Sequence, residues 1–96
     1  MRILLVEDER PISSFVARGL REEGHGVEVV EDLAAARLRL DEDWDLLLVD
    51  RMLPDGDGLQ LVRDERRRGS RVPAICLTAR DRVATRRSFG NRFRKA

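Results

Sequence analysis

Four short apolar stretches along the chain predict the strands of a sheet. They cover residues 3–6, 27–31, 46–50 and 74–78. The first and third contain the uninterrupted runs ILLV and LLLV, as expected of strands that are covered on both faces. The second, VEVVE, is rich in β-branched residues, which favour strands.

Helical periodicity fills the gaps between these strands. The first helix is expected to start at Pro11 and to end before Gly24. Its inward stripe is predicted to be formed by Ile12, Phe15, Val16, Gly19 and Leu20. Asp32 can cap a second helix over residues 33–43, and Asp57 a third that Gly69 ends. The resulting order, βαβαβαβ, predicts an α/β fold with a parallel sheet and helices on both faces.

The composition narrows the class of protein. The chain has 96 residues, of which 42% are hydrophobic and 39% charged, which fits one small globular domain. No apolar run approaches the length of a membrane helix, and the first strand is too short for the core of a signal peptide. A single cysteine, Cys76, excludes an internal disulfide and argues against a zinc cluster. A cytoplasmic location is therefore expected.

Charge is distributed unevenly along the chain. Residues 1–79 hold 12 arginines against 17 acidic residues, a net charge of −5. Residues 80–96 hold seven basic residues and one acidic residue, a net charge of +6. We divide the chain into a domain over 1–82 and a basic tail over 83–96 that could be helical. Charges on such a short tail are commonly just solvated, so direct DNA binding is not expected.

Polar residues stand where three of the predicted strands end. Glu7 and Asp8 follow the first strand, Asp50 ends the third and Thr78 ends the fourth. In an open parallel sheet the carboxyl ends of the strands form the ligand-binding edge. Three carboxylates close together repel one another, and a hard cation such as Mg²⁺ relieves that repulsion. The turn after Asp50 would let the Met52 carbonyl reach the same ion.

Such a site suits phosphoryl transfer. Asp50 is a candidate nucleophile that would form an acyl phosphate, and the Thr78 hydroxyl could donate to a phosphate oxygen. Asp55 and Asp57 are interpreted as turn and cap residues instead of ligands. His25, between two glycines, is interpreted as a solvated loop residue, and Cys76 as part of the core.

The segments "RILLVEDE", "LLLVDRMLPDGDG" and "VPAICLTARD" together resemble the receiver domain of bacterial two-component response regulators. The sequence over residues 2 to about 82 is most similar to the receivers of OmpR/PhoB-like winged-helix transcription regulators. The resemblance implies a flavodoxin-like (CheY-like) three-layer fold, with strand order 2-1-3-4 for the strands present.

The resemblance also assigns roles to residues. It implies that Asp50 accepts phosphate from a sensor histidine kinase. It implies that Glu7, Asp8, Asp50 and the Met52 carbonyl bind Mg²⁺, and that Thr78 is the hydroxyl that moves toward the phosphate. Such a domain is a signalling module, not an enzyme with turnover.

The chain departs from the family beyond Arg82. No β-branched run follows, so the family's fifth strand, its lysine and its fifth helix are expected to be missing, as after a truncation or a frameshift. The fourth strand, 74–78, would then be an open edge available for self-association. Lys95 has no apolar strand before it, so it is not assigned the role of the family's lysine.

Two other classes of function remain open from the sequence. An aspartate-nucleophile phosphohydrolase would need an acid two residues after Asp50, where Met52 stands. A degenerate receiver that only docks or dimerises, without phospho-switching, is the stronger alternative because the family's lysine is missing.

Overall fold

The computed structural model describes residues 1–77 and 93–95 and folds them around one sheet. The main strands and helices follow the predicted order closely. They are β1 (Arg2–Val6), α1 (Arg10–Glu22), β2 (Gly26–Val30), α2 (Leu33–Arg37), β3 (Leu46–Asp50), α3 (Gly58–Arg67), β6 (Ala74–Leu77) and β7 (Phe93–Lys95). Between β3 and α3 lies a small antiparallel pair, β4 (Met52–Leu53) and β5 (Gly56–Asp57).

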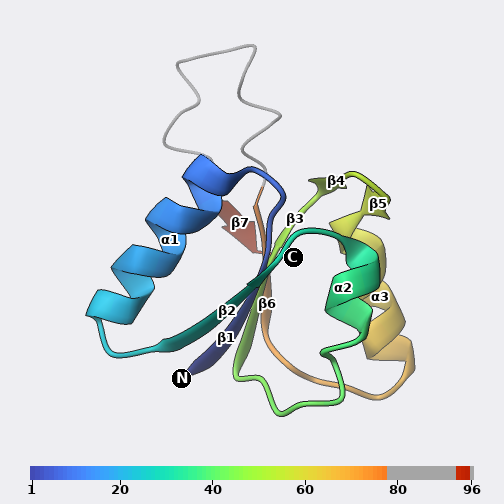
Figure 1. The fold of residues 1–96 in the computed structure, drawn as a ribbon. Coiled ribbons are helices and arrows are strands. Elements are labelled where there is room, and N and C mark those ends of the chain that lie inside the picture. The colour runs from blue at the N-terminus through green and yellow to red at the C-terminus, as the bar shows by residue number, and fades with distance from the viewer. Residues whose placement is uncertain (78–92, 96) are drawn as a thin grey trace.

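The strands β2, β1, β3 and β6 are parallel neighbours in that order, which confirms the predicted order 2-1-3-4. Figure 1 shows α1 on one side of the sheet, with α2 and α3 on the other. This is the predicted three-layer α/β/α architecture. In the register of the sheet, Val6 pairs with Val49 and Asp50 pairs with Leu77, so the carboxyl ends of the central strands are level with one another.

Alternation along the buried strands divides the core into two halves. Leu4, Val6 and Val49 pack with Leu61 on the side of α2 and α3. Ile3, Leu5 and Leu48 pack with Ala17 on the side of α1. Both faces of β1 are therefore covered, which explains why its sequence has no polar residue between Ile3 and Val6.

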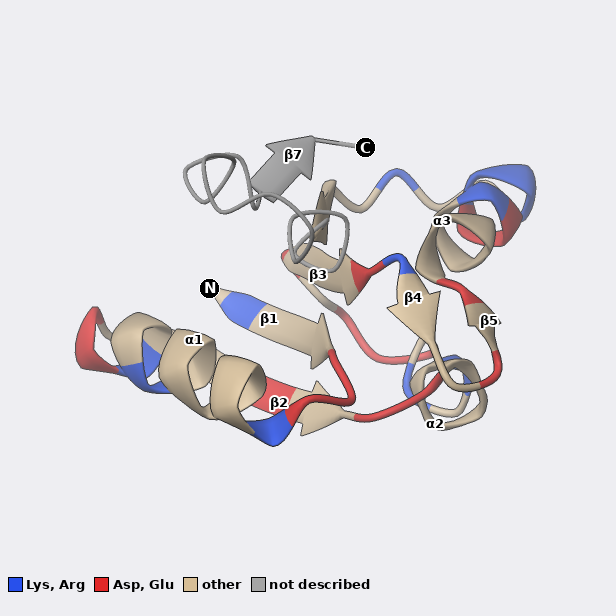
Figure 2. Cartoon of the chain, turned by 90° about the horizontal axis from the view of Figure 1, so that it is seen from above, with Lys and Arg blue, Asp and Glu red and all other residues tan. Residues whose placement is uncertain are grey.

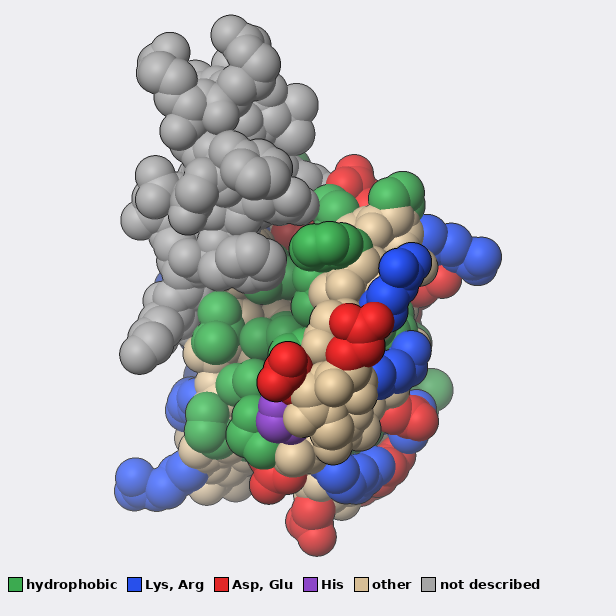
Figure 3. Space-filling model, turned by 90° about the vertical axis from the view of Figure 1, so that its left-hand side faces the viewer, with side chains coloured by type: hydrophobic (Ala, Val, Ile, Leu, Met, Phe, Trp, Pro, Cys, Tyr) green, Lys and Arg blue, Asp and Glu red, His purple; other side chains and the backbone are tan. Residues whose placement is uncertain are grey.

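The predicted inward stripe of α1 is wrong in two residues. Phe15 is 78% exposed and Gly19 is also exposed, whereas Ser13 and Ala17 are buried. Ser13 and Ala17 are small, so the face of α1 that carries them can approach the sheet closely. Phe15 then lies on the outward face of the helix. Together with Leu20 and Leu48 it lines a shallow, mainly apolar hollow, and Figure 3 shows hydrophobic side chains exposed on this side of the molecule.

The second helix is shorter than the predicted 33–43. It is capped as expected, since the Asp32 side chain accepts a hydrogen bond from the Ala35 N–H (2.8 Å), but it ends at Arg37. The chain then turns, because the indole N–H of Trp44 donates to the carbonyl of Arg39 (2.8 Å). That carbonyl also accepts from the Glu42 N–H in a tight turn (3.1 Å), which replaces the helical pattern.

A strand pairs with the edge that we expected to be open. β7 runs antiparallel to β6, with Phe93 opposite Leu77 and Lys95 opposite Ile75. The expectation of an exposed fourth-strand edge is therefore wrong for the described residues, while self-association stays a prediction. A helix is also wrong for residues 93–95. The physical reason is that unpaired strand edges favour any extended partner, even one of three residues. The family's parallel fifth strand is not found in the described residues.

No helix in the described part of the chain combines the length and the apolar character needed to cross a bilayer.

Candidate metal centre

The three predicted carboxylates meet at the carboxyl edge of the sheet. One oxygen from each of Glu7, Asp8 and Asp50 lies within 4.8 Å of the other two. Figure 2 shows the acidic segment after β1 and the acidic end of β3 at this edge. The strands bring together residues more than 40 positions apart in the sequence, as the pattern predicted.

Two of these acids are almost completely buried. Glu7 and Asp50 are each 1% exposed, and Asp8 is half-buried. The Glu7 N–H donates to the Val30 carbonyl (2.9 Å), which continues the pairing of β1 with β2 one residue past the strand. The Oε2 of Glu7 accepts from the Glu9 N–H (2.9 Å). Local backbone bonds therefore hold the Glu7 carboxylate in place.

Asp50 is held in a similar way by the turn that follows it. Its Oδ1 accepts a hydrogen bond from the Met52 N–H (3.2 Å). This bond places the Met52 backbone beside the carboxylate, where the sequence predicted a carbonyl ligand.

The donor set fits Mg²⁺. That ion takes oxygen ligands in octahedral geometry, with a small number of carboxylates and the remaining positions left to water or phosphate. Three carboxylates packed this closely also repel one another unless a cation or a proton intervenes. A divalent cation is the group that satisfies both conditions.

The segment after Asp50 folds back tightly on the strand. The Gly58 N–H donates to the Arg51 carbonyl (2.9 Å), and β4 pairs with β5 in between. A Cβ at Gly58 would lie 2.1 Å from the Asp50 carbonyl oxygen. Gly56 has a φ of +147°, a conformation that favours glycine. Both glycines of the DGDG motif are thus required by the backbone.

Arg51 and Asp57 close this hairpin with an ion pair. Arg51 Nη2 lies 2.7 Å from Asp57 Oδ2, and its Nε donates to Oδ1 (3.2 Å). Asp57 also caps α3 by accepting from the Leu59 N–H (2.9 Å), as predicted. The Arg51 guanidinium, with this cap bond, lowers the pKa of the Asp57 carboxyl below its usual value.

Asp55 has a role that the sequence did not show. Its two carboxylate oxygens accept from the N–H groups of Leu33 and Ala34 (2.8 and 3.0 Å), at the start of α2. These backbone bonds, that of Leu33 above all, lower the pKa of Asp55. The hairpin is therefore tied to α2. Local pattern carried no signal for this contact because its partners lie 22 and 21 residues earlier in the chain.

The other predicted site residue, Thr78, lies outside the described residues, so its role stays a prediction. The backbone of Lys95 is placed by β7. It pairs with Ile75, two positions before the carboxyl end of β6, so its Cα does not lie level with Asp50. The exclusion of Lys95 from the site likewise stays a prediction.

The sequence profile of the response regulator receiver domain family matches residues 3–90. The match extends eight residues beyond Arg82, and the domain boundary at that residue stays a prediction. Among curated proteins, the response regulator PmrA of Pseudomonas aeruginosa is 44% identical over 90% of this chain. The transcriptional regulatory protein HprR of Escherichia coli is 40% identical over the same share. The chain spans only 39% of the length of each of these two relatives.

Solved structures show the same fold. The non-phosphorylated HemR receiver domain from Leptospira biflexa matches with a TM-score of 0.74 and 31% identity, over 93% of this chain and 73% of that one. The MaeR response regulator bound to beryllium trifluoride matches with a TM-score of 0.76 and 30% identity, over 82% of this chain and 67% of that one. The receiver domain of the Francisella response regulator 1452 matches in fold, with a TM-score of 0.78 and 24% identity, over 93% and 73% of the two chains.

Proposed function

Because the chain belongs to the response regulator receiver domain family, we propose that Asp50 is its phosphoacceptor and that a sensor histidine kinase is the donor. The observation that carries the proposal is the position of the Asp50 carboxylate, which is buried at the sheet edge within 4.8 Å of the oxygens of Glu7 and Asp8.

The reaction moves one phosphoryl group. A carboxylate oxygen of Asp50 attacks the phosphorus of a phosphohistidine, the new P–O bond forms as the P–N bond breaks, and the imidazole nitrogen leaves with the bond's electron pair. The product on this chain is an acyl phosphate. The hydrogen bond from the Met52 N–H to Oδ1 orients the carboxylate for this attack.

Glu7, Asp8, Asp50 and the Met52 carbonyl would hold Mg²⁺. When bound, the ion neutralises the charge of the carboxylates and of the incoming phosphoryl oxygens. The chain's own contribution is positioning, through the backbone bonds that fix Glu7 and Asp50. Thr78 is the proposed donor to a phosphate oxygen of the product.

The wider setting follows from the relatives. The chain is proposed to act in the cytoplasm as a signalling module without catalytic turnover, and to pass its state to a partner instead of binding DNA itself. PmrA and HprR are regulators of more than twice this length, so a transcriptional output would be supplied by sequence outside these 96 residues. A domain that only docks has no need of three converging carboxylates, so the acidic cluster favours phosphoryl transfer over the docking-only alternative.

Incubation with acetyl phosphate and Mg²⁺, followed by mass spectrometry of the intact chain, tests the proposal. The expected result is an adduct with the mass of one phosphoryl group that is absent from Asp50→Asn. Asp43→Asn, which changes an exposed carboxylate before β3, is the matched control and should be modified like the unaltered chain. An adduct that persists in Asp50→Asn, or none in the unaltered chain, contradicts the proposal.

A further inference from the structure

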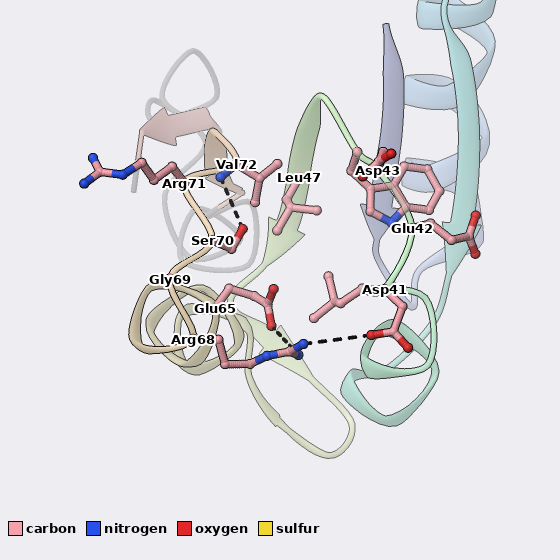
Figure 4. A pocket seen from close by; sticks show the side chains of 12 residues that line it. Asp41, Glu42, Asp43, Leu47, Glu65, Arg68, Gly69, Ser70, Arg71 and Val72 are labelled. Atoms are coloured by element: carbon pink, nitrogen blue, oxygen red, sulfur yellow. Dashed lines mark hydrogen bonds and ion pairs between the residues drawn. The ribbon is translucent and has the colours of Figure 1, made fainter.

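A second pocket lies at the opposite edge of the sheet from the three carboxylates. It is formed by the segment before β3, the last turn of α3 and the segment before β6 (Figure 4). Its volume is about 600 Å³. These segments precede the amino ends of β3 and β6, whereas Glu7 and Asp50 stand at carboxyl ends, so the two sites are separate.

The wall of the pocket next to the sheet is apolar. Leu47 is fully buried in the core, and Leu40 and Val72 pack against the same cluster while lining the pocket. An aliphatic group placed here would bury apolar surface on both partners.

Glu65 supplies the main polar group of the pocket. It is 4% exposed, although it belongs to the last turns of α3, and Figure 4 shows its carboxylate directed into the pocket. Its Oε2 accepts from Arg68 Nη1 (3.1 Å). Within the described residues, its Oε1 makes no hydrogen bond. Oε1 is not among the fully buried atoms that lack a hydrogen-bond partner, so it reaches the open pocket and can accept a hydrogen bond from a group placed there.

The electrostatics of the pocket favour a positive ligand. Glu42 lines the pocket but is already paired with Arg2 and Arg39, which lie outside the lining. The other charged lining residues are three acids and two arginines, a net charge of −1; they are Asp41, Asp43, Glu65, Arg68 and Arg71. Arg68 is already shared between Glu65 and Asp41, whose Oδ1 lies 3.9 Å from its Nη2. The carbonyl end of α3 adds partial negative charge at the same place. An anion would have to displace the carboxylates from Arg68, since Figure 4 shows the Arg71 side chain directed away from the pocket.

We propose that this pocket binds a cationic group on an aliphatic stem, an alkylguanidinium or alkylammonium. The head donates to Glu65 Oε1 beside Arg68, and the stem lies against Leu47 and Val72. Such a group could come from a small amine or from an arginine or lysine side chain of a partner. The inference does not depend on phosphoryl transfer at Asp50.

The chain contains its own reporter for this test. Trp44 is its only tryptophan, lines the pocket, and is half-buried. Titration of the full chain with n-butylguanidinium in the millimolar range, followed by Trp44 fluorescence, is expected to give a saturable change. Three compounds at equal concentration serve as controls: guanidinium lacks the aliphatic stem, n-butanol lacks the charged head, and butyrate carries the opposite charge. Each should bind more weakly than n-butylguanidinium.

Glu65→Gln keeps the shape of the side chain and removes its charge. It should raise the dissociation constant about tenfold or more, as expected for loss of a hydrogen bond to a charged group. Asp64→Asn removes the same charge from the neighbouring position of α3, outside the pocket, and should leave binding unchanged. Circular dichroism of both variants establishes that they are folded.

A peptide with one internal arginine distinguishes the two sources of the ligand. Binding of the peptide as tight as that of n-butylguanidinium assigns the pocket to a partner's side chain, and exclusion of the peptide alone assigns it to a small cation. The proposal is overturned if n-butylguanidinium causes no saturable change, if Glu65→Gln binds it equally well, or if butyrate binds more tightly.

Discussion

Gly58 lies against the backbone of Asp50 so closely that a Cβ there would meet the Asp50 carbonyl oxygen at 2.1 Å and Val49 Cγ1 at 2.4 Å. The start of α3 is thereby pressed onto the end of β3. The geometry of Asp50 and the packing of α3 therefore depend on the absence of a side chain at residue 58.

Gly58→Ala is expected to destabilise the fold. A methyl group at this place must push backbone atoms apart, and overpacking of this kind costs about 1–3 kcal/mol of unfolding free energy. Urea unfolding followed by circular dichroism measures the loss. Gly19→Ala is the matched control, because nothing lies within 4 Å of a Cβ at that position in α1. It should be neutral or stabilising by about 0.5–1 kcal/mol. Equal stability of the two variants would contradict the close contact.

Asp55→Ala is expected to loosen the hairpin that carries Met52. The substitution removes both acceptors of the Leu33 and Ala34 N–H groups, so the tie between the hairpin and α2 is lost. The midpoint of thermal unfolding should fall, and the concentration of Mg²⁺ needed for half-saturation should rise. Asp32→Ala is the control. It also removes a hydrogen bond to the start of α2, but Asp32 directly precedes that helix and does not belong to the hairpin. It should lower the unfolding midpoint without changing the response to Mg²⁺.

The ion pairs of Glu42 are expected to make the fold less stable in acid. Its hydrogen bonds to Arg39 and Arg2 lower its pKa from 4.5 to about 2. A carboxyl whose pKa is lowered by folding stabilises the fold at pH values above its unfolded pKa. That contribution is lost as the pH falls through the interval from 4.5 to about 2.

The pH dependence of urea unfolding, measured for the unaltered chain and for Glu42→Gln, tests this assignment. Between those two pH values, the unfolding free energy of the variant should fall less than that of the unaltered chain. Glu23→Gln, which changes an exposed glutamate at the end of α1, should show the same decline as the unaltered chain. Identical pH profiles for Glu42→Gln and the unaltered chain would show that this ion pair contributes nothing.

Leu61→Ala should cost much of the stability of so small a domain. Leu61 belongs to α3 and is fully buried in the core, and truncation of a buried leucine costs about 2–5 kcal/mol. The same change at Leu38, which is 81% exposed, should stay within about 0.5 kcal/mol of the unaltered chain. Urea unfolding distinguishes the two, and a small effect at Leu61 would contradict the assigned core.

The sequence predicted the sheet and its acidic edge because both depend on strong local signals. The run from Leu46 to Val49 allows only a buried strand, and Asp50 follows it directly, so the strand's position fixes that of the carboxylate. The caps at Asp32 and Asp57 were equally local, since each acceptor bonds an N–H two or three residues away.

The errors have the opposite character, because each depends on a contact distant in sequence. The orientation of Phe15 is set by how closely α1 approaches the sheet, and the early end of α2 by the Trp44 indole. The pairing of β7 with β6 joins residues about 18 positions apart with little pattern of their own. The spacing of apolar residues indicates which face of a helix or strand is apolar. It does not indicate which other part of the chain packs against that face.

The central proposal is that Glu7, Asp8 and the phosphoacceptor Asp50 form one Mg²⁺ site. The most direct test is a Mg²⁺ titration of the ¹⁵N-labelled chain followed by its amide chemical shifts. The account predicts saturable shifts concentrated at residues 7–9 and 50–52, and their loss in Asp8→Asn and in Asp50→Asn. Shifts spread over the acidic surface, or a titration that both variants leave unchanged, would contradict it.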